Sequence, residues 1–202
     1  MSVEHLFPEP LYFSKLERVL TKKELKILNE YKKKPEKNAG NSRTNDSYVL
    51  EHKGLKNLKK DLQTQVRDYF DKVVCTTNIT PYITQSWINY TKENQFHHRH
   101  SHPNSLVSGI FYINADKNVD SVTFYKNYQD ARIKLDITEY NIFSSSNCTF
   151  PVETGNLLIF RSSLEHGVKK KKGNNIRISL SFNIFIKGTV GNKNDLSELI
   201  IK

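Results

Sequence analysis

From Pro81 onward the chain is a series of short runs rich in β-branched and aromatic residues, each bounded by turn residues. Such runs predict β-strands rather than helices. Several short strands joined by irregular loops favour a sandwich or jelly roll, so we expect a mainly β fold. The predicted strands are Tyr82 to Tyr90, Leu106 to Ile113, Ser121 to Tyr125, Ile133 to Ile137, Asn156 to Phe160 and Ile176 to Ile186.

The first third of the chain predicts helices. Thr21 and Glu24 form a capping-box pattern that is followed by apolar residues at helical spacing, so a helix is expected over about 22–33. After Gly54, apolar residues recur every three or four positions as far as Val73, the pattern of an amphipathic helix. We expect both helices to pack on the outside of one sheet. Residues 35–47 and 138–149 predict loops, the second of them mobile and near a site.

A chain of 202 residues is long enough for one well-packed core and short for two. We therefore expect a single domain, in which residues 1–78 pack on a β core of 79–188 and residues 189–202 form a tail. No stretch approaches the roughly 20 apolar residues that span a bilayer, and the N-terminus lacks the pattern of a signal peptide, so no membrane association and a cytoplasmic location are expected. Cys75 and Cys148 suggest neither a disulfide framework nor a thiolate zinc site.

The formal net charge is +10, from 31 Lys and Arg against 21 Asp and Glu, which favours anionic partners in general. Much of the excess is scattered lysine without interleaved arginine and aromatic residues, so a nucleic-acid partner is disfavoured and is kept as an alternative. The one dense run, Lys169 to Lys172, precedes Gly173 in a predicted turn and is expected to be solvated. The sequence leaves open whether this run binds an anionic partner.

Four of the seven histidines lie close together, at His97, His98, His100 and His102. In an extended chain, residues i and i+2 project to the same side, so His100 and His102 can face one metal ion, and so could His98 and His100. Imidazole is a ligand that suits Fe, Zn, Cu and Ni. His166 offers a third ligand, although a lone histidine at a strand edge is more often an ordinary surface or hydrogen-bonded residue.

The last long predicted strand alternates polar and apolar residues. Arg177, Ser179 and Ser181 share one face, while the opposite face is apolar. An inward arginine requires a buried anion, because an unpaired guanidinium in a core costs several kcal/mol. Its planar fork fits a carboxylate, and Ser179 can add a hydrogen bond to the same group. The alternative is an arginine that pairs with a protein carboxylate or points to solvent.

These motifs together resemble iron- and 2-oxoglutarate-dependent oxygenases, including phage-encoded members. The resemblance covers roughly residues 80 to 186 and implies a double-stranded β-helix (jelly-roll, cupin-like) core. It also implies an Fe(II) enzyme that uses 2-oxoglutarate and oxygen, most simply to hydroxylate a substrate, in the host cytoplasm if the chain is phage-encoded. The motifs that carry it are His100-Ser-His102-Pro-Asn-Ser, Ser108-Gly-Ile-Phe-Tyr112, Gly155-Asn-Leu-Leu-Ile-Phe160, His166 and Arg177-Ile-Ser179.

By this resemblance His100, His102 and His166 bind iron, and Arg177 and Ser179 bind 2-oxoglutarate. His102 stands where the wider superfamily has an aspartate or glutamate, so three neutral imidazoles would leave a divalent metal with its full charge of +2.

Neighbouring polar and aromatic residues are weaker candidates. Tyr112 and Asn89 could bind the co-substrate and Trp87 could line the pocket, although core packing is the more ordinary role for each. Arg161 and Asn183 are further candidates for substrate contact, without a geometric argument. The substrate and the oligomeric state are not apparent. The rival hypotheses are a cupin-like metal protein without 2-oxoglutarate chemistry, which has no need of an inward arginine, and a nucleic-acid-directed protein.

Overall fold

Two antiparallel sheets face each other in the computed structural model, which describes residues 2–126 and 136–202. The larger sheet has the strand order β1-β9-β6-β11-β4-β3-β2, with β12 paired to β11, and the smaller has the order β5-β10-β7-β8. The larger sheet consists of β1 (Leu11–Lys15), β2 (Glu36–Lys37), β3 (Ser42–Arg43), β4 (Ile79–Thr91), β6 (Val107–Asn114), β9 (Asn156–Arg161), β11 (Arg177–Val190) and β12 (Leu199–Ile201). The smaller consists of β5 (His97–His100), β7 (Ser121–Tyr125), β8 (Asn147–Pro151) and β10 (His166–Val168).

Two α-helices precede most of the strands, as the sequence predicts. Helix α1 (Lys22–Lys32) begins at the capping box of Thr21 and Glu24. Helix α2 (Lys56–Tyr69) follows the short turns η1 (Val49–Glu51) and η2 (Lys53–Leu55) and continues into the π-turn η3 (Phe70–Val74). Its apolar stripe is buried, so the predicted amphipathic helix is confirmed. None of the described helices is long and apolar enough to cross a membrane.

The strand alternation divides the apolar side chains between two cores. One face of the larger sheet packs against the helices, where α2 residues such as Leu58 and Leu62 belong to the same core as Leu180 and Phe182 of β11. The other face packs against the smaller sheet in a second core, formed by Ile110, Tyr112, Val122, Phe124, Val152, Leu158 and Phe160. The polar face of β11 therefore lies between the two sheets, which places Arg177 inside the protein.

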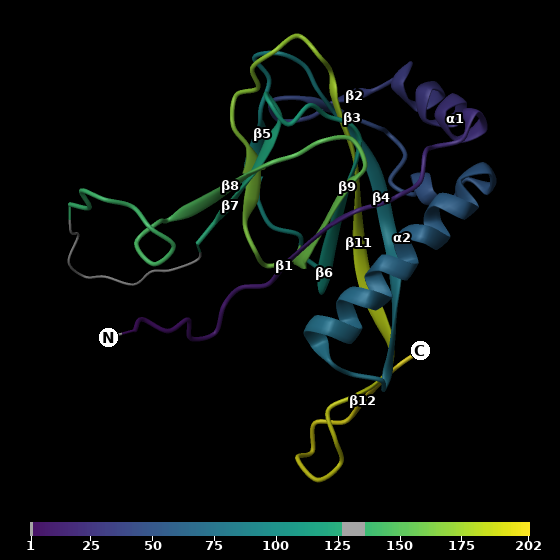
Figure 1. Cartoon of the computed structure of the whole chain (residues 1–202). Helices are drawn as coiled ribbons and strands as arrows, with labels where there is room; N and C mark the ends of the chain where they lie inside the picture. Colours follow the sequence, from purple (N-terminus) through teal and green to yellow (C-terminus); the bar gives the residue numbers. More distant parts are fainter. Residues whose placement is uncertain (1, 127–135) are drawn as a thin grey trace.

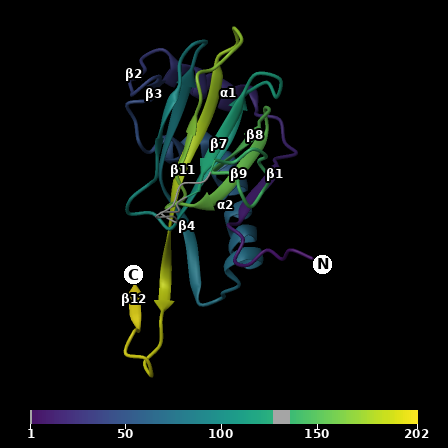
Figure 2. The same ribbon diagram turned by 90° about the vertical axis from the view of Figure 1, so that its left-hand side faces the viewer.

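The layers are visible in the ribbon views. From left to right, Figure 1 shows the pair β7 and β8, then the larger sheet, then α1 and α2 on its outer side. Turned by 90°, Figure 2 shows β7 and β8 in front of β9 and β11. This mainly β arrangement, with N-terminal helices on one sheet, confirms the jelly-roll expectation.

Several local predictions need correction. The segment 35–47, expected to be a loop, contains the short hairpin of β2 and β3. The expected loop 138–149 ends in β8, which pairs with β7. The predicted strand Ile133 to Ile137 lies largely outside the described residues, and its last two positions are not in a strand. Strands β1, β5, β10 and β12 were not predicted, because they are short or polar and depend on pairing with a neighbour.

The lysine run 169–172 is only partly solvated. Lys169, Lys170 and Lys172 are exposed, but Lys171 is buried. The Nζ atom of Lys171 donates to the Lys172 and Gly173 carbonyls at 2.9 and 3.0 Å and lies 3.6 Å from Asp120. The expectation of a solvated run is therefore wrong for Lys171, whose charge is held inside a turn.

Candidate metal centre

Three histidines from two adjacent strands and a turn meet between the sheets. His100 ends β5, His102 lies in the following turn, and His166 begins β10, which pairs with β5 so that His166 is opposite His100. The ring centroids are 4.4 Å apart for His100 and His166, and 5.1 Å apart for each of the other two pairs. One ring nitrogen from each histidine lies within 4.8 Å of the other two. The structure thus brings together the three residues singled out in the sequence.

In each of the three rings, one nitrogen lies within hydrogen-bond distance of a backbone carbonyl or side-chain amide oxygen. His100 Nδ1 lies 2.8 Å from the His98 carbonyl, and His166 Nδ1 lies 3.1 Å from the Leu164 carbonyl. His102 Nδ1 lies 2.7 Å from Asn183 Oδ1. Because such oxygens only accept hydrogen bonds, the proton of each neutral ring belongs on Nδ1. Nε2 then keeps its lone pair in all three rings, which is the arrangement that metal ligation requires.

The surroundings keep these imidazoles neutral. Burial, together with the neighbouring His102 and His98, lowers the pKa of His100 to about 4. Burial also lowers the pKa of His102, and it lowers that of His166 to well below its usual value, with His100 and His102 contributing. The clustering therefore produces three neutral nitrogen donors at pH 7, a donor set that suits Fe, Zn, Cu and Ni.

A small cavity next to the histidines contains a buried cation. It is lined by His100 and His166, by Asn89, and by Arg177 and Ser179. The Arg177 side chain is 3% exposed and has no ion pair among the described residues. Its Nη2 lies 3.4 Å from the Tyr112 hydroxyl, while its Nε has no hydrogen-bond partner. Arg177 thus lies on the inner face of β11, as the strand alternation predicts.

Two further groups in this region are suited to bind an anion or a carbonyl compound with Arg177. Burial raises the pKa of Tyr112, so its hydroxyl keeps its proton at neutral pH and can donate it. Asn89 donates to Ser181 Oγ at 3.1 Å, and its buried Oδ1 has no partner. An unpaired buried guanidinium costs several kcal/mol, so this cavity is built for a ligand that carries a negative charge. The charges present therefore fit a carboxylate beside a metal, and since the cavity itself measures only about 20 Å³, the rest of a dicarboxylate would lie toward the histidines and the open cleft.

An open cleft of about 800 Å³ adjoins the histidines on the solvent side. Its wall combines the aromatic side chains of Tyr82, Trp87 and Phe185 with amide side chains, including Asn104 and Asn183. Trp87, His97 and His100 line both this cleft and the small inner cavity, so they lie where the two spaces meet. Trp87 is thus at the pocket and only half-buried.

His97 and His98 have different surroundings. His97 is half-buried against His100, with ring centroids 4.5 Å apart, and burial lowers its pKa to about 3. His98 is exposed and forms a second group with His97 and His100, the alternative that strand spacing left open. The position of His97 at the junction was not deduced from the sequence. Its closeness to the cluster was the available signal.

Some sequence candidates lie elsewhere or have another contact. Arg161 is exposed, lies 3.9 Å from Glu9 and lines a different groove from the cleft beside the histidines. Asn183 lines the cleft and also accepts from His102. Residues 138–146 line neither the cleft nor the cavity and extend away from the sheets on the left of Figure 1. The expectation of a loop near the site is not met by these described residues.

Comparisons with known proteins give one family match. Residues 85–183 match the family model described as "Putative 2OG-Fe(II) oxygenase", and they include the three histidines, Arg177 and Ser179. No curated protein matches the sequence.

Solved structures with low sequence identity share the fold. An oxidoreductase of the 2OG-Fe(II) oxygenase family from Burkholderia pseudomallei is 16% identical, with a TM-score of 0.55, over 80% of this chain and 77% of that one. HygX from Streptomyces hygroscopicus, with nickel, 2-oxoglutarate and hygromycin B bound, is 13% identical, with a TM-score of 0.56, over 85% and 82%. A prolyl hydroxylase from Trichoplax adhaerens is 15% identical, with a TM-score of 0.54, over 80% and 75%.

Proposed function

We propose that the chain is a 2OG-Fe(II) oxygenase, the family whose model residues 85–183 match, and that it hydroxylates a substrate held in the cleft beside the three histidines. Members of the family are 2-oxoglutarate-dependent non-haem iron oxygenases, that is, oxidoreductases. The proposal concerns the residue roles and the reaction type. A cytoplasmic location and a phage origin stay predictions from the sequence.

In this proposal His100, His102 and His166 hold Fe(II) through Nε2. Their Nδ1 hydrogen bonds fix the ring orientations, and burial keeps the rings neutral. Arg177 and Ser179 bind the distal carboxylate of 2-oxoglutarate, while Tyr112 and Asn89 supply further hydrogen bonds at the inner cavity. The single observation that supports the co-substrate most strongly is the buried Arg177 with its unpartnered Nε.

Bound iron and 2-oxoglutarate together supply the oxidising chemistry, in which oxygen and the co-substrate convert a substrate C–H group to C–OH with release of succinate and carbon dioxide. The residues of the chain bind and orient the co-substrate and the substrate and are not assigned a proton transfer. Arg177 fixes the co-substrate deep between the sheets, and the surrounding core excludes water. Trp87, His97 and His100 separate this inner cavity from the open cleft, so a substrate approaches from the solvent side.

The test is an anaerobic titration of the Fe(II)-loaded protein with 2-oxoglutarate, monitored by the visible metal-to-ligand charge-transfer band. We expect a saturable band that bleaches with oxygen while succinate is released. Arg177→Ala should retain metal and weaken 2-oxoglutarate binding at least about 30-fold, because an anion loses its buried charge partner. The exposed Arg161→Ala is the matched control and should leave the titration unchanged.

Two outcomes would contradict the proposal. A metal-loaded protein that gives no band would support the rival cupin-like metal protein. An Arg177→Ala variant with unchanged 2-oxoglutarate affinity would remove the role given to this arginine, even if the enzyme is active.

A further inference from the structure

The positive charge of the chain is concentrated in one part of it. Residues 18–60 hold 13 Lys and Arg against 5 Asp and Glu, a net charge of +8. The whole chain has a net charge of +10, so the other 159 residues contribute only +2. The segment 18–60 contains α1, the β2–β3 hairpin, the turns η1 and η2, and the start of α2. We call the outer surface of these elements the basic face.

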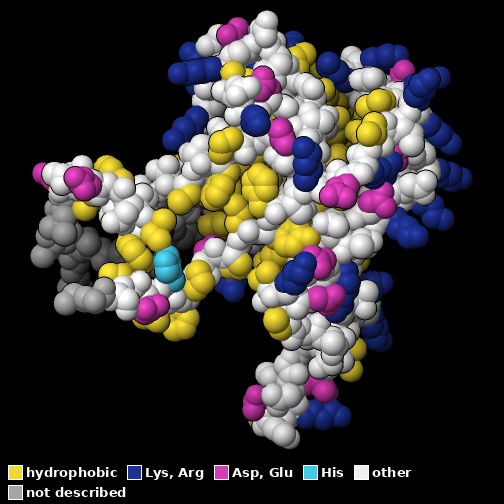
Figure 3. Space-filling view, viewed as in Figure 1, with side chains coloured by type: hydrophobic (Ala, Val, Ile, Leu, Met, Phe, Trp, Pro, Cys, Tyr) yellow, Lys and Arg dark blue, Asp and Glu magenta, His cyan; other side chains and the backbone are white. Residues whose placement is uncertain are grey.

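Most lysines of the basic face are exposed and lack a partner. Nine of them are exposed, and their ammonium groups have no ion pair or hydrogen bond among the described residues: Lys22, Lys23, Lys26, Lys32, Lys34, Lys37, Lys53, Lys56 and Lys60. In Figure 3 the dark-blue side chains gather at the upper right, over α1 and the neighbouring end of α2. Their charges are not neutralised within the fold, so they create a positive potential on this side of the molecule.

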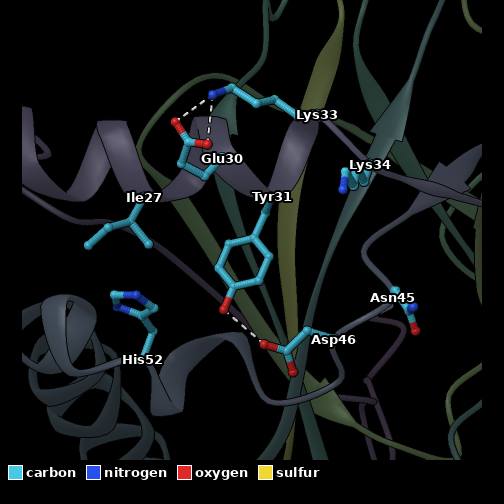
Figure 4. Close-up of a pocket in the computed structure, with 8 residues that line it drawn as sticks. All are labelled: Ile27, Glu30, Tyr31, Lys33, Lys34, Asn45, Asp46 and His52. Atoms are coloured by element: carbon cyan, nitrogen blue, oxygen red, sulfur yellow. Dashed lines mark hydrogen bonds and ion pairs between the residues drawn. The ribbon is translucent and has the colours of Figure 1, made fainter.

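A groove of about 630 Å³ lies within the basic face, between α1 and the segment 45–52. Figure 4 shows its wall, which includes Lys33, Lys34, Asn45 and His52. Both acidic side chains of the groove are already engaged. Glu30 pairs with Lys33 at 2.7 Å, and Asp46 accepts from the Tyr31 hydroxyl at 2.8 Å. The groove lining thus holds two cations, Lys33 and Lys34, and two anions, Glu30 and Asp46, so the positive potential at the groove comes from the exposed lysines around it.

The composition of the basic face favours one class of negatively charged partner among three: an acidic protein, an anionic membrane and a nucleic acid. Lysine is depleted in protein–protein interfaces, so a face dominated by lysine fits an acidic protein poorly. A membrane-binding helix would present a continuous apolar face, yet in α1 Leu28 is buried in the core, Ile27 packs against it, and Leu25 alone of the three is exposed, at 40%. Interfaces with nucleic acids are strongly positive and are made mostly with phosphates. The lysines look scattered in the sequence, which argues against a nucleic-acid partner, but the fold gathers those of residues 18–60 on one face, where they can contact phosphates.

We propose that the basic face binds the phosphate backbone of a nucleic acid independently of base sequence. The face continues from α1 through Lys37 of β2 to Asn38, which lines the cleft at the metal centre. A nucleic acid on the basic face would therefore extend to the mouth of this cleft. This binding goes beyond the proposed oxygenase function and does not depend on it.

The experiment measures binding of a fluorescein-labelled 20-nucleotide DNA, as a single strand and as a duplex, by anisotropy over a range of NaCl concentrations. We expect a Kd in roughly the micromolar range at about 50 mM NaCl and a linear fall of log affinity with log salt. Replacing Lys26, Lys34 and Lys53 together by Glu should weaken binding at least about tenfold and reduce the salt slope by about 2–3.

The matched control replaces Lys169, Lys170 and Lys172 by Glu, which changes the net charge equally on exposed lysines outside the segment 18–60. It should weaken binding less than about threefold. An unchanged 2-oxoglutarate titration and an unchanged melting temperature establish that each variant is folded. If a Glu variant is not folded, the corresponding Gln variant takes its place.

Three results would overturn the proposal: no binding of either DNA, equal weakening by the two triple variants, or tighter binding of poly-glutamate or of phosphatidylserine vesicles than of DNA. Failure of the 2-oxoglutarate titration would contradict the proposed function and leave this inference standing.

Discussion

Asn183 Oδ1 lies 2.7 Å from Nδ1 of His102, and Ser108 Oγ lies 3.1 Å from the same nitrogen. His102 occupies the position where a carboxylate was expected from the family pattern, so its orientation and tautomer depend on these neighbours. Hydrogen bonds of this kind typically contribute a factor of about 10–100 to metal affinity. Asn183 is thus a positioning residue for the proposed metal ligand.

We predict that Asn183→Leu lowers affinity for Ni(II), used as an oxygen-stable probe, by about 10–100-fold, because His102 loses the acceptor for its Nδ1 proton. Asn183→Asp keeps an acceptor at the same place and should bind the metal at least as tightly as the unmodified protein. Asn104→Leu is the control, since Asn104 lines the same cleft and is exposed. Isothermal titration gives the affinities. Equal losses for the Leu and Asp variants would refute the positioning role.

At the residue scale, pattern alone located much of the candidate site. Spacing placed His100 and His102 on one side, and alternation placed Arg177 and Ser179 on the inner face of a strand. The roles of Asn183 and His97 could not be deduced, because they depend on distances between residues that are far apart in the sequence or on the direction of a ring. Burial of Lys171 was also missed, since its partner Asp120 is 51 positions away.

The start of α1 shows how one buried carboxylate stabilises an element. Glu24 is 3% exposed and accepts from the Thr21 backbone N–H at 2.8 Å, and it pairs with Arg18. Burial by itself raises the pKa of the Glu24 carboxyl, but Arg18 and the two hydrogen bonds from Thr21 outweigh it and hold the pKa below its usual value. The folded state therefore binds this proton less readily than the unfolded state.

It follows that the stabilisation by Glu24 is fully present above its unfolded pKa of about 4.3 and is lost as pH falls through the lower folded value. Glu24→Gln should lower the free energy of unfolding at pH 7 by about 1–3 kcal/mol and flatten its pH dependence below about pH 4.5. Urea unfolding at several pH values measures both effects. Glu30→Gln, in an exposed pair with Lys33, should change the free energy by less than about 0.5 kcal/mol. An equal effect of both variants would show that burial of Glu24 is unimportant.

The turn that contains Lys171 connects β10 with β11, and its buried charge links this turn to Asp120 before β7. We predict that Lys171→Met lowers the free energy of unfolding by about 3–5 kcal/mol, because Asp120 is then left buried without its cation. Lys170→Met removes an exposed lysine from the same turn and should be nearly neutral. Denaturant unfolding distinguishes the two. A neutral Lys171→Met variant would mean that Asn175, which donates to Asp120 at 2.7 Å, suffices alone.

Elements with their own periodic pattern were predicted well, and elements that depend on a partner were not. The α2 stripe and the alternation in β4, β6, β9 and β11 are visible in the sequence because each element has a consistently buried face. Strand β5 is made of four polar residues, His97-His-Arg-His100, and exists because β10 pairs with it. No propensity rule would assign it to a sheet.

For the whole molecule, the proposed ligands should act as stabilisers. They bind between the two sheets, where only the folded chain presents the histidines and Arg177 together. Ligands at about 100 times their Kd stabilise a protein by about 2.7 kcal/mol. For a chain of 202 residues this corresponds to a rise in melting temperature of about 5–10 °C.

We therefore predict that Ni(II) with 2-oxoglutarate raises the melting temperature by about 5–10 °C and that a chelator reverses the rise. His166→Ala should respond to neither ligand, whereas Arg177→Ala should respond to Ni(II) alone. Differential scanning fluorimetry gives the comparison. A response of His166→Ala equal to that of the unmodified protein would place the metal elsewhere.

One strand, β11, carries Arg177 and Asn183 on its inner face and Leu180 and Phe182 on its outer face. A shift of one residue in its pairing would exchange these two sets, sending the guanidinium toward the helices and apolar side chains into the cavity. A single-residue insertion or deletion within 177–184 that is not absorbed by a β-bulge, of the kind already present between Phe182 and Ile184, would thus disturb ligand binding and core packing together. A substitution in this strand changes one side chain on one face, whereas a change in its length alters both faces at once.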